Sequence, residues 1–170
     1  MTSANIKILI RFLLLIPLQV LIANHMRLFG YINPQICLLF ALWYPLKKDI
    51  SGFLVTSFLF GLIIDMFSNS GGVNAAACLL IAYARLPILK FVFNDRDLNL
   101  KLFKYSNYGT VPKIVLIFCL ALIHQLTIYA LEYFSFSHIL SILYKTFTNS
   151  LFTTFVVIIF LSIFTSTKKQ

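Results

Sequence analysis

Long apolar runs separated by short polar breaks dominate the chain. The runs lie at about residues 8–23, 34–46, 51–67, 73–91, 112–134 and 146–165. Most approach the roughly 20 residues that a helix needs to cross a hydrocarbon core of about 30 Å. The pattern predicts a single all-α integral membrane domain with six transmembrane helices.

Two of these runs are irregular. The run at 34–46 is short for a span, so local thinning of the bilayer or an earlier start near Tyr31 is needed. The run at 73–91 contains Arg85 and Pro87. Either this helix spans to about Lys90 with the Arg85 side chain snorkelling to the interface, or Pro87 kinks it and its last turns lie in the interface. A kink is also expected at Pro17 in the first run.

Composition supports the membrane class and excludes most soluble ones. The 170 residues are 60% hydrophobic and only 11% charged, with a mean hydropathy of +0.92, whereas soluble domains are about 25% charged. The net charge of +9 does not indicate nucleic-acid binding, because the basic residues flank the apolar runs and no nucleic-acid-reading motif is present.

The same basic residues predict the orientation of the chain. With six spans, every Lys and Arg except Arg27 and Lys145 falls on the side of the two termini. Positive residues favour the cytoplasmic side. Both termini are therefore expected in the cytoplasm, and Asp65 is expected to face outward.

One face of the third run carries small and acidic residues. Ser57, Gly61 and Asp65 are spaced by four, which places them on one side of a helix. Small residues allow a neighbouring membrane helix to approach closely. This stripe therefore predicts a helix-packing or partner-contact surface.

A turn follows Asp65 and leads into the next helix. Residues 68–72 include Gly71 and Gly72, which tolerate left-handed backbone. A helix starting near Val73 would bring its free N–H groups close to the carboxylate. Asp65 is expected to accept hydrogen bonds from main-chain N–H groups around Gly71 to Asn74, or from a neighbouring span. The alternative is a solvated carboxylate at a helix end in the headgroup region.

Polar side chains also lie inside the fifth run. His124 and Gln125 fall near its middle, and Gln125, Tyr129 and Glu132 share a helical face. A charge at mid-bilayer costs roughly 2.5 to 3.5 kcal/mol on insertion scales, so such groups turn inward. One interpretation is a proton relay or ligand pocket built from His124 and Glu132. The other is a set of interhelical hydrogen bonds, with Glu132 close to the outer interface.

The sequence offers few other candidates for metal binding, redox chemistry or catalysis. Cys37, Cys78 and Cys119 lie in three different apolar runs, without a CxxC or a neighbouring histidine, which predicts buried inert thiols rather than a metal or redox site. The sequence contains no HExxH, GxSxG or Walker A motif. Neither enzymatic activity nor a cofactor is expected.

The block GLIIDMFSNSGGVNAAACLLIAYAR at residues 61–85 resembles the rod shape-determining protein MreD family of bacteria. The family's most recognisable stretch is Gly-Leu-x-x-Asp at the end of a span, then a Gly-containing turn and an Ala-rich helix. The matching positions are Gly61, Leu62, Asp65, Gly71, Gly72, Asn74 and Ala75 to Ala77. The segment ALIHQLTIYALEYFSF at 121–136 is similar to the fifth-span region of one branch of the family.

This resemblance implies a non-catalytic, multi-pass protein of the bacterial inner membrane that takes part in cell-wall elongation. Its partners would be a bitopic MreC-like protein and, more widely, the MreB filament, the RodA glycosyltransferase and a class B penicillin-binding protein. The family is also similar in fold to the S components of energy-coupling factor vitamin transporters. A small-molecule binding protein of that kind is the alternative, and a small ion or multidrug transporter is a third.

Overall fold

The computed structural model describes residues 3–22, 33–46, 50–94, 108–133 and 139–166, and every regular element in these ranges is a helix. The elements are α1 (Ser3–Pro17), the π-helical turn η1 (Leu18–Ile22), α2 (Cys37–Trp43), α3 (Ser51–Ser68), α4 (Val73–Val92), α5 (Thr110–Tyr133) and α6 (Ile139–Ser166). The predictions for the third, fourth and fifth runs are confirmed. The last helix begins earlier than expected, at Ile139 instead of 146.

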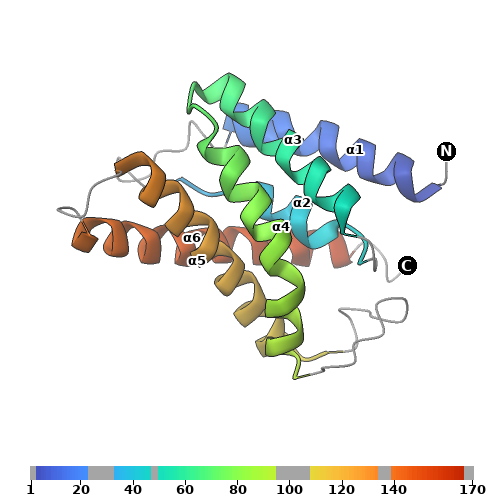
Figure 1. The fold of residues 1–170 in the computed structure, drawn as a ribbon. Helices are drawn as coiled ribbons and strands as arrows, with labels where there is room; N and C mark the ends of the chain where they lie inside the picture. The colour runs from blue at the N-terminus through green and yellow to red at the C-terminus, as the bar shows by residue number, and fades with distance from the viewer. Residues whose placement is uncertain (1–2, 23–32, 47–49, 95–107, 134–138, 167–170) are drawn as a thin grey trace.

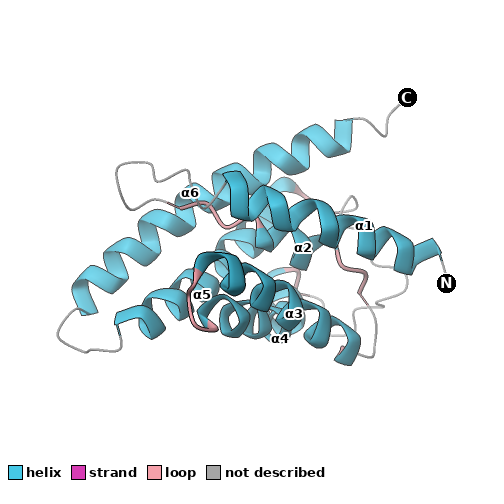
Figure 2. Cartoon of the chain, turned by 90° about the horizontal axis from the view of Figure 1, so that it is seen from above, coloured by secondary structure: helices cyan, strands magenta, loops and turns pink. Residues whose placement is uncertain are grey.

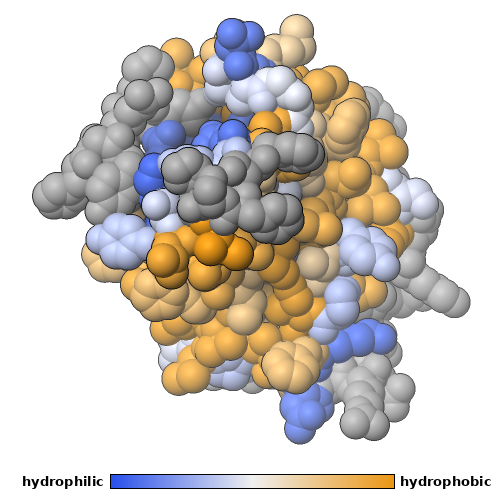
Figure 3. Space-filling model, turned by 60° about the vertical axis from the view of Figure 1, so that its left-hand side comes forward, coloured by the Kyte–Doolittle hydropathy of each residue, from blue (hydrophilic) through white to orange (hydrophobic). Residues whose placement is uncertain are grey.

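Four helices in the described ranges, α3 to α6, are long and apolar enough to cross a membrane. The apolar stretch of the first helix, Ile8–Leu21, is shorter. Apolar residues cover the middle of the face seen in Figure 3, and hydrophilic residues gather toward its top and its lower right. The prediction of an all-helical fold with helices able to span a membrane is confirmed for the described ranges, whereas six spans and cytoplasmic termini stay predictions.

The long helices pack in chain order. The most extensive contacts join α3 to α4, α4 to α5, and α5 to α6, and the short α2 lies in the middle of the molecule (Figure 1). Figures 1 and 2 both place the start of α1, the start of α3 and the end of α6 toward one side.

At Pro17, where the sequence predicts a kink, the structure shows a change of helix type. The α-helix ends at Pro17, and a π-helical turn continues to Ile22. Proline has no N–H to donate, and its ring crowds the preceding turn. A locally wider turn is one way for a helix to accommodate this.

The prediction of a helix over 34–46 is wrong in length, because α2 has only 7 residues. At 1.5 Å per residue it extends about 10 Å, a third of the bilayer core. It ends at Trp43, and the next residue, Tyr44, has an extended backbone with φ −66° and ψ 133°. Pro45 explains this end, since a residue before proline is disfavoured in the helical region.

Gln19 supplies the missing bonds at the start of α2. Its Oε1 accepts hydrogen bonds from the backbone N–H groups of Ile36 at 2.6 Å and Cys37 at 3.3 Å. Its Nε2 donates to Pro34 O at 3.4 Å. Because Gln19 is fully buried, this side chain from η1 replaces the water that would otherwise satisfy the backbone there.

Side chains of α6 satisfy the non-helical segment that precedes α2. Asn149 Oδ1 accepts from the N–H of Asn33 at 2.8 Å, and Thr153 Oγ1 accepts from the N–H of Gln35 at 3.3 Å. Both belong to a buried polar stripe on α6 made of Thr146, Asn149, Ser150, Thr153 and Thr154. Irregular backbone at membrane depth is tolerated where protein groups satisfy it in this way.

Two arginines bind the carbonyl groups at the end of α2. Arg85 donates from Nη2 to Tyr44 O at 2.7 Å and Leu42 O at 3.2 Å, and Arg11 donates from Nη1 to Trp43 O at 2.6 Å. Cations at a helix C-terminus also interact favourably with its dipole. Arg85 is 2% exposed, so the snorkelling interpretation is wrong, and α4 continues through Pro87 to Val92.

Candidate functional site

Asp65 joins the end of α3 to the start of α4. Its Oδ1 accepts hydrogen bonds from the N–H of Asn74 at 2.9 Å, from Asn74 Nδ2 at 3.0 Å and from Ser70 Oγ. Its Oδ2 accepts from the N–H of Ala75 at 2.8 Å. The predicted main-chain hydrogen bond is confirmed at Asn74, and the structure adds a second one at Ala75.

These bonds make Asp65 the capping residue of a helix to which it does not belong. The N-cap position of α4 is Gly72, which has no side chain to accept a bond. Normally an N-cap oxygen accepts from the second or third N–H of its own helix. Here Asp65 accepts both, while the N–H of Val73 donates to Ser70 O at 3.3 Å. The first turn of α4 is thereby satisfied, and its positive end lies beside a carboxylate.

The burial of Asp65 decides between the two sequence interpretations. Its side chain is only 5% exposed, so it is not a solvated carboxylate at a helix end. Both of its oxygens are occupied by donors from the protein. Asp65 therefore acts as a buried hydrogen-bond acceptor.

The turn between the two helices has the backbone that its sequence predicts. Asn69 ends α3 in the left-handed region at φ 52°, and Gly71 and Gly72 follow with φ of 63° and 94°. A Cβ at either glycine would meet no atom within 4 Å. These glycines are required by backbone conformation and not by space.

Gly61 is required for the opposite reason. A Cβ built there would lie 2.5 Å from Asn74 O and 2.6 Å from Ala75 Cα. The α3 and α4 backbones therefore touch at this point, which confirms the close approach predicted for the small-residue stripe. Ser57, one turn earlier, is buried, and its Oγ has no hydrogen-bond partner in the described part of the chain.

The polar residues of α5 do not form the predicted relay. His124 and Gln125 are buried, whereas Glu132 is exposed near the end of the helix. Eight residues along one helix separate His124 from Glu132 by about 12 Å. The two side chains are therefore too far apart for a direct proton transfer between them. His124 Nδ1 and Gln125 Nε2 have no partner among the described residues, so the expected interhelical bonds are absent at these two atoms.

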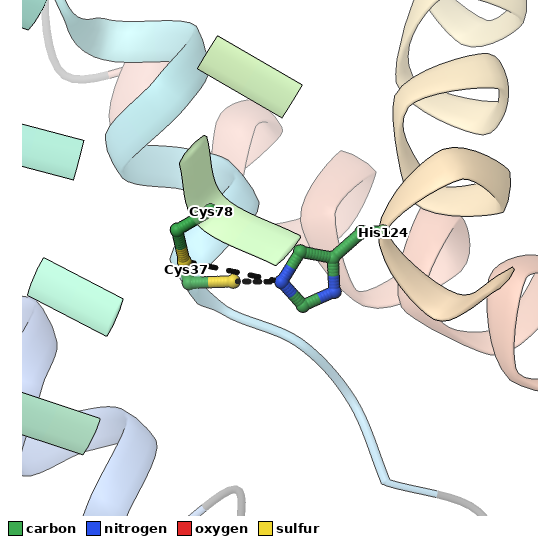
Figure 4. A group of neighbouring side chains, drawn as sticks. All are labelled: Cys37, Cys78 and His124. Carbon is green, nitrogen blue, oxygen red and sulfur yellow. Dashed lines mark hydrogen bonds between the residues drawn. The ribbon is translucent and has the colours of Figure 1, made fainter. Parts of the chain in front are cut away.

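His124 instead faces two of the cysteines (Figure 4). Its Nε2 lies 3.3 Å from Cys37 Sγ and 3.9 Å from Cys78 Sγ. All three residues are buried, while Cys119 is half-buried. The interpretation of Cys37 and Cys78 as isolated thiols without a neighbouring histidine is therefore wrong. The side chains come from the start of α2, from α4 and from α5, so their sequence spacing carried no signal.

Sequence reasoning also missed the polar groups that hold α2. For the α6 stripe a signal was available, since Thr146, Asn149, Ser150, Thr153 and Thr154 lie three or four residues apart in the charge-free run that begins at 146. This is the spacing of one helical face. For Gln19 no such signal exists, because a single glutamine in an apolar run does not identify its partner.

The described chain is thus an all-helical protein with four helices capable of crossing a membrane, held together by buried side-chain bonds to backbone groups. Comparisons with known protein families, with curated proteins and with solved structures found no match. Any more specific assignment rests on the residues themselves.

Proposed function

We propose that this protein is a non-catalytic inner-membrane component of the bacterial cell-wall elongation machinery, of the MreD type. The observation that carries the proposal is the junction of α3 and α4. The residues that resemble the MreD stretch are the ones that build this junction: Gly61 allows the helices to touch, Asp65 caps α4, and Gly71 and Gly72 form the turn.

The hydrogen bonds that Asp65 accepts support a scaffolding role. Asp65 is the acidic residue of the resembling block, and both of its oxygens accept hydrogen bonds from the protein. A general base must reach the proton that it removes. Asp65 has its acceptor positions directed at α4, which suits a structural role.

In this proposal the chain crosses the inner membrane with both termini in the cytoplasm, and the Asp65 junction lies on the outer side. The bitopic MreC-like protein is the direct partner, within a wider assembly of the MreB filament, RodA and a class B penicillin-binding protein. Reporter fusions near Asn99 should give a cytoplasmic signal, and fusions near Ser70 an external one. An external signal near Asn99 would contradict the orientation.

Depletion in a rod-shaped bacterial host tests the function. Cells should become round or swollen, and affinity-tagged protein purified in mild detergent should retain the MreC-like partner. Re-expression of the Asp65→Ala variant should restore shape less well than wild type at equal protein level. Unchanged cell shape after depletion would rule the proposal out.

Small-molecule binding, as in the S component of a vitamin transporter, is the second candidate. It is favoured by the buried Nδ1 of His124 and Nε2 of Gln125, which have no partner among the described residues and could bind a ligand. Loss of uptake of one vitamin on depletion, with cell shape intact and energising ATPases copurifying, would support this candidate over the first.

A further inference from the structure

The cluster of Cys37, Cys78 and His124 has the dimensions of a metal site (Figure 4). The two sulfur atoms lie 3.3 Å and 3.9 Å from His124 Nε2, and all three atoms are within 4.8 Å of one another. In a tetrahedral zinc site with Zn–S of about 2.3 Å and Zn–N of about 2.0 Å, sulfur and nitrogen ligands lie about 3.6 Å apart and two sulfurs about 3.8 Å. Shifts of about 1 Å or less bring the cluster to these values.

Without an ion, only weak thiol hydrogen bonds join the three side chains, and the Cys37 thiol also donates to Gln35 Oε1 at 3.9 Å. Nε2 of a neutral imidazole offers one lone pair, and a thiol is a weak donor. Cys37 and Cys78 both approach that single nitrogen. One cation that displaces both thiol protons and takes the lone pair would instead bond all three atoms.

Charge balance indicates a divalent ion. The cluster is buried between apolar helices, where an uncompensated charge is costly. Binding of one divalent cation to two neutral thiols and a neutral imidazole releases two protons and leaves the site neutral. A monovalent ion on two thiolates would leave one negative charge. Thiolate and imidazole ligands select zinc over magnesium or calcium.

We propose that Cys37, Cys78 and His124 bind one Zn²⁺ ion. Gln35 is the candidate for a fourth ligand, since its Oε1 lies 3.9 Å from Cys37 Sγ and the residue is buried. The ion would tie the start of α2 to α4 and α5. A structural role follows, because α2 has only 7 residues and depends on side chains from other helices at both ends. This inference does not depend on the proposed function.

Metal analysis of the full-length protein in detergent tests the site. Protein purified under reducing conditions, exposed to Zn²⁺ and freed of excess ion should hold one zinc per chain. The Cys37→Ser, Cys78→Ser and His124→Ala variants should each bind zinc at least tenfold more weakly. Cys119→Ser is the matched control, because Cys119 lies on α5 outside the cluster, and it should bind like wild type.

Measurements on the wild-type protein keep the test valid if a variant fails to fold. Co²⁺ in place of Zn²⁺ should give a thiolate-to-cobalt charge-transfer band in the near ultraviolet. Zn²⁺ should raise the melting temperature, and a chelator should reverse the rise. Because binding releases two protons, the apparent affinity for Zn²⁺ should fall as the pH is lowered.

Two results would overturn the proposal. The first is wild-type protein that holds no stoichiometric zinc and shows no cobalt band. The second is zinc binding by the folded Cys37→Ser and Cys78→Ser variants that equals that of Cys119→Ser.

Discussion

Replacing Asp65 with alanine should destabilise the protein more than any other change of an acidic residue in the described chain. The substitution removes the acceptor for the N–H groups of Asn74 and Ala75, and also for the side chains of Ser70 and Asn74. Asp65 is 5% exposed, and its bond from the N–H of Ala75 is buried. The freed main-chain donors therefore have no ready replacement.

The magnitude follows from these two donors. A buried donor left without an acceptor costs about 1 to 3 kcal/mol, and loss of an N-cap in soluble proteins costs about 0.5 to 2 kcal/mol. The two together favour a loss of about 2 to 4 kcal/mol in the free energy of unfolding, which is about a 30- to 700-fold change in the equilibrium constant. By the scaling for chains of this length, the melting temperature falls by about 4 to 16 °C.

Thermal unfolding in one mild detergent, followed by circular dichroism, measures this effect. Asp65→Asn keeps one carbonyl oxygen in the same place and should recover about half of the loss, since it still accepts from one of the two N–H groups. Glu132→Ala is the matched control, because Glu132 is an exposed carboxylate on α5. Exposed substitutions stay within about 0.5 kcal/mol.

Two outcomes would refute the reasoning. One is a melting temperature for Asp65→Ala that matches wild type. The other is an equal loss for Asp65→Ala and Glu132→Ala, which would mean that removing any carboxylate has the same effect and that capping of α4 contributes nothing specific.

Gly61→Ala should lower the melting temperature, since its Cβ would lie 2.5 Å from Asn74 O, and overpacking costs about 1 to 3 kcal/mol. Gly52→Ala in the same helix meets no atom closer than 3.6 Å and should be neutral or stabilising; equal effects would contradict the contact at Gly61. Arg85→Met should lower the free energy of unfolding by about 2 to 4 kcal/mol, because the carbonyl groups of Leu42 and Tyr44 lose their donor. Arg85→Lys should recover only part of this loss, and a methionine variant as stable as wild type would contradict the role of Arg85. Gln19→Leu should lower the free energy of unfolding by about 2 to 4 kcal/mol in the same assay, because the start of α2 loses its acceptor. An unchanged melting temperature would count against the capping role of Gln19.

The α3–α4 junction was predictable because all of its parts are close in sequence. Asp65 and its donors at positions 70, 74 and 75 lie within one helix-turn-helix. Helix periodicity places Ser57, Gly61 and Asp65 on one face, and glycine chemistry places the turn. Local geometry was therefore enough to bring the carboxylate to the start of α4.

The segment around α2 was not predictable in the same way. Hydropathy indicates burial but does not distinguish a spanning helix from a short helix enclosed by protein, because both are apolar. Pro45 was visible as the stop signal. The groups that make the short helix possible, Gln19, Asn149 and Arg85, are brought to it only by packing.

The sequence by itself determined the all-helical, strongly apolar character of the chain, the positions of α3, α4 and α5 and the nearness of Asp65 to the start of α4. Each of these follows from residue chemistry repeated at helical spacing or confined to one turn. Only the tertiary structure decided that Arg85 points inward and that Cys37 and Cys78 meet at His124. The partners in those contacts lie more than 40 residues apart, and the contacts depend on how α2, α4 and α5 pack, which no periodicity in the sequence encodes.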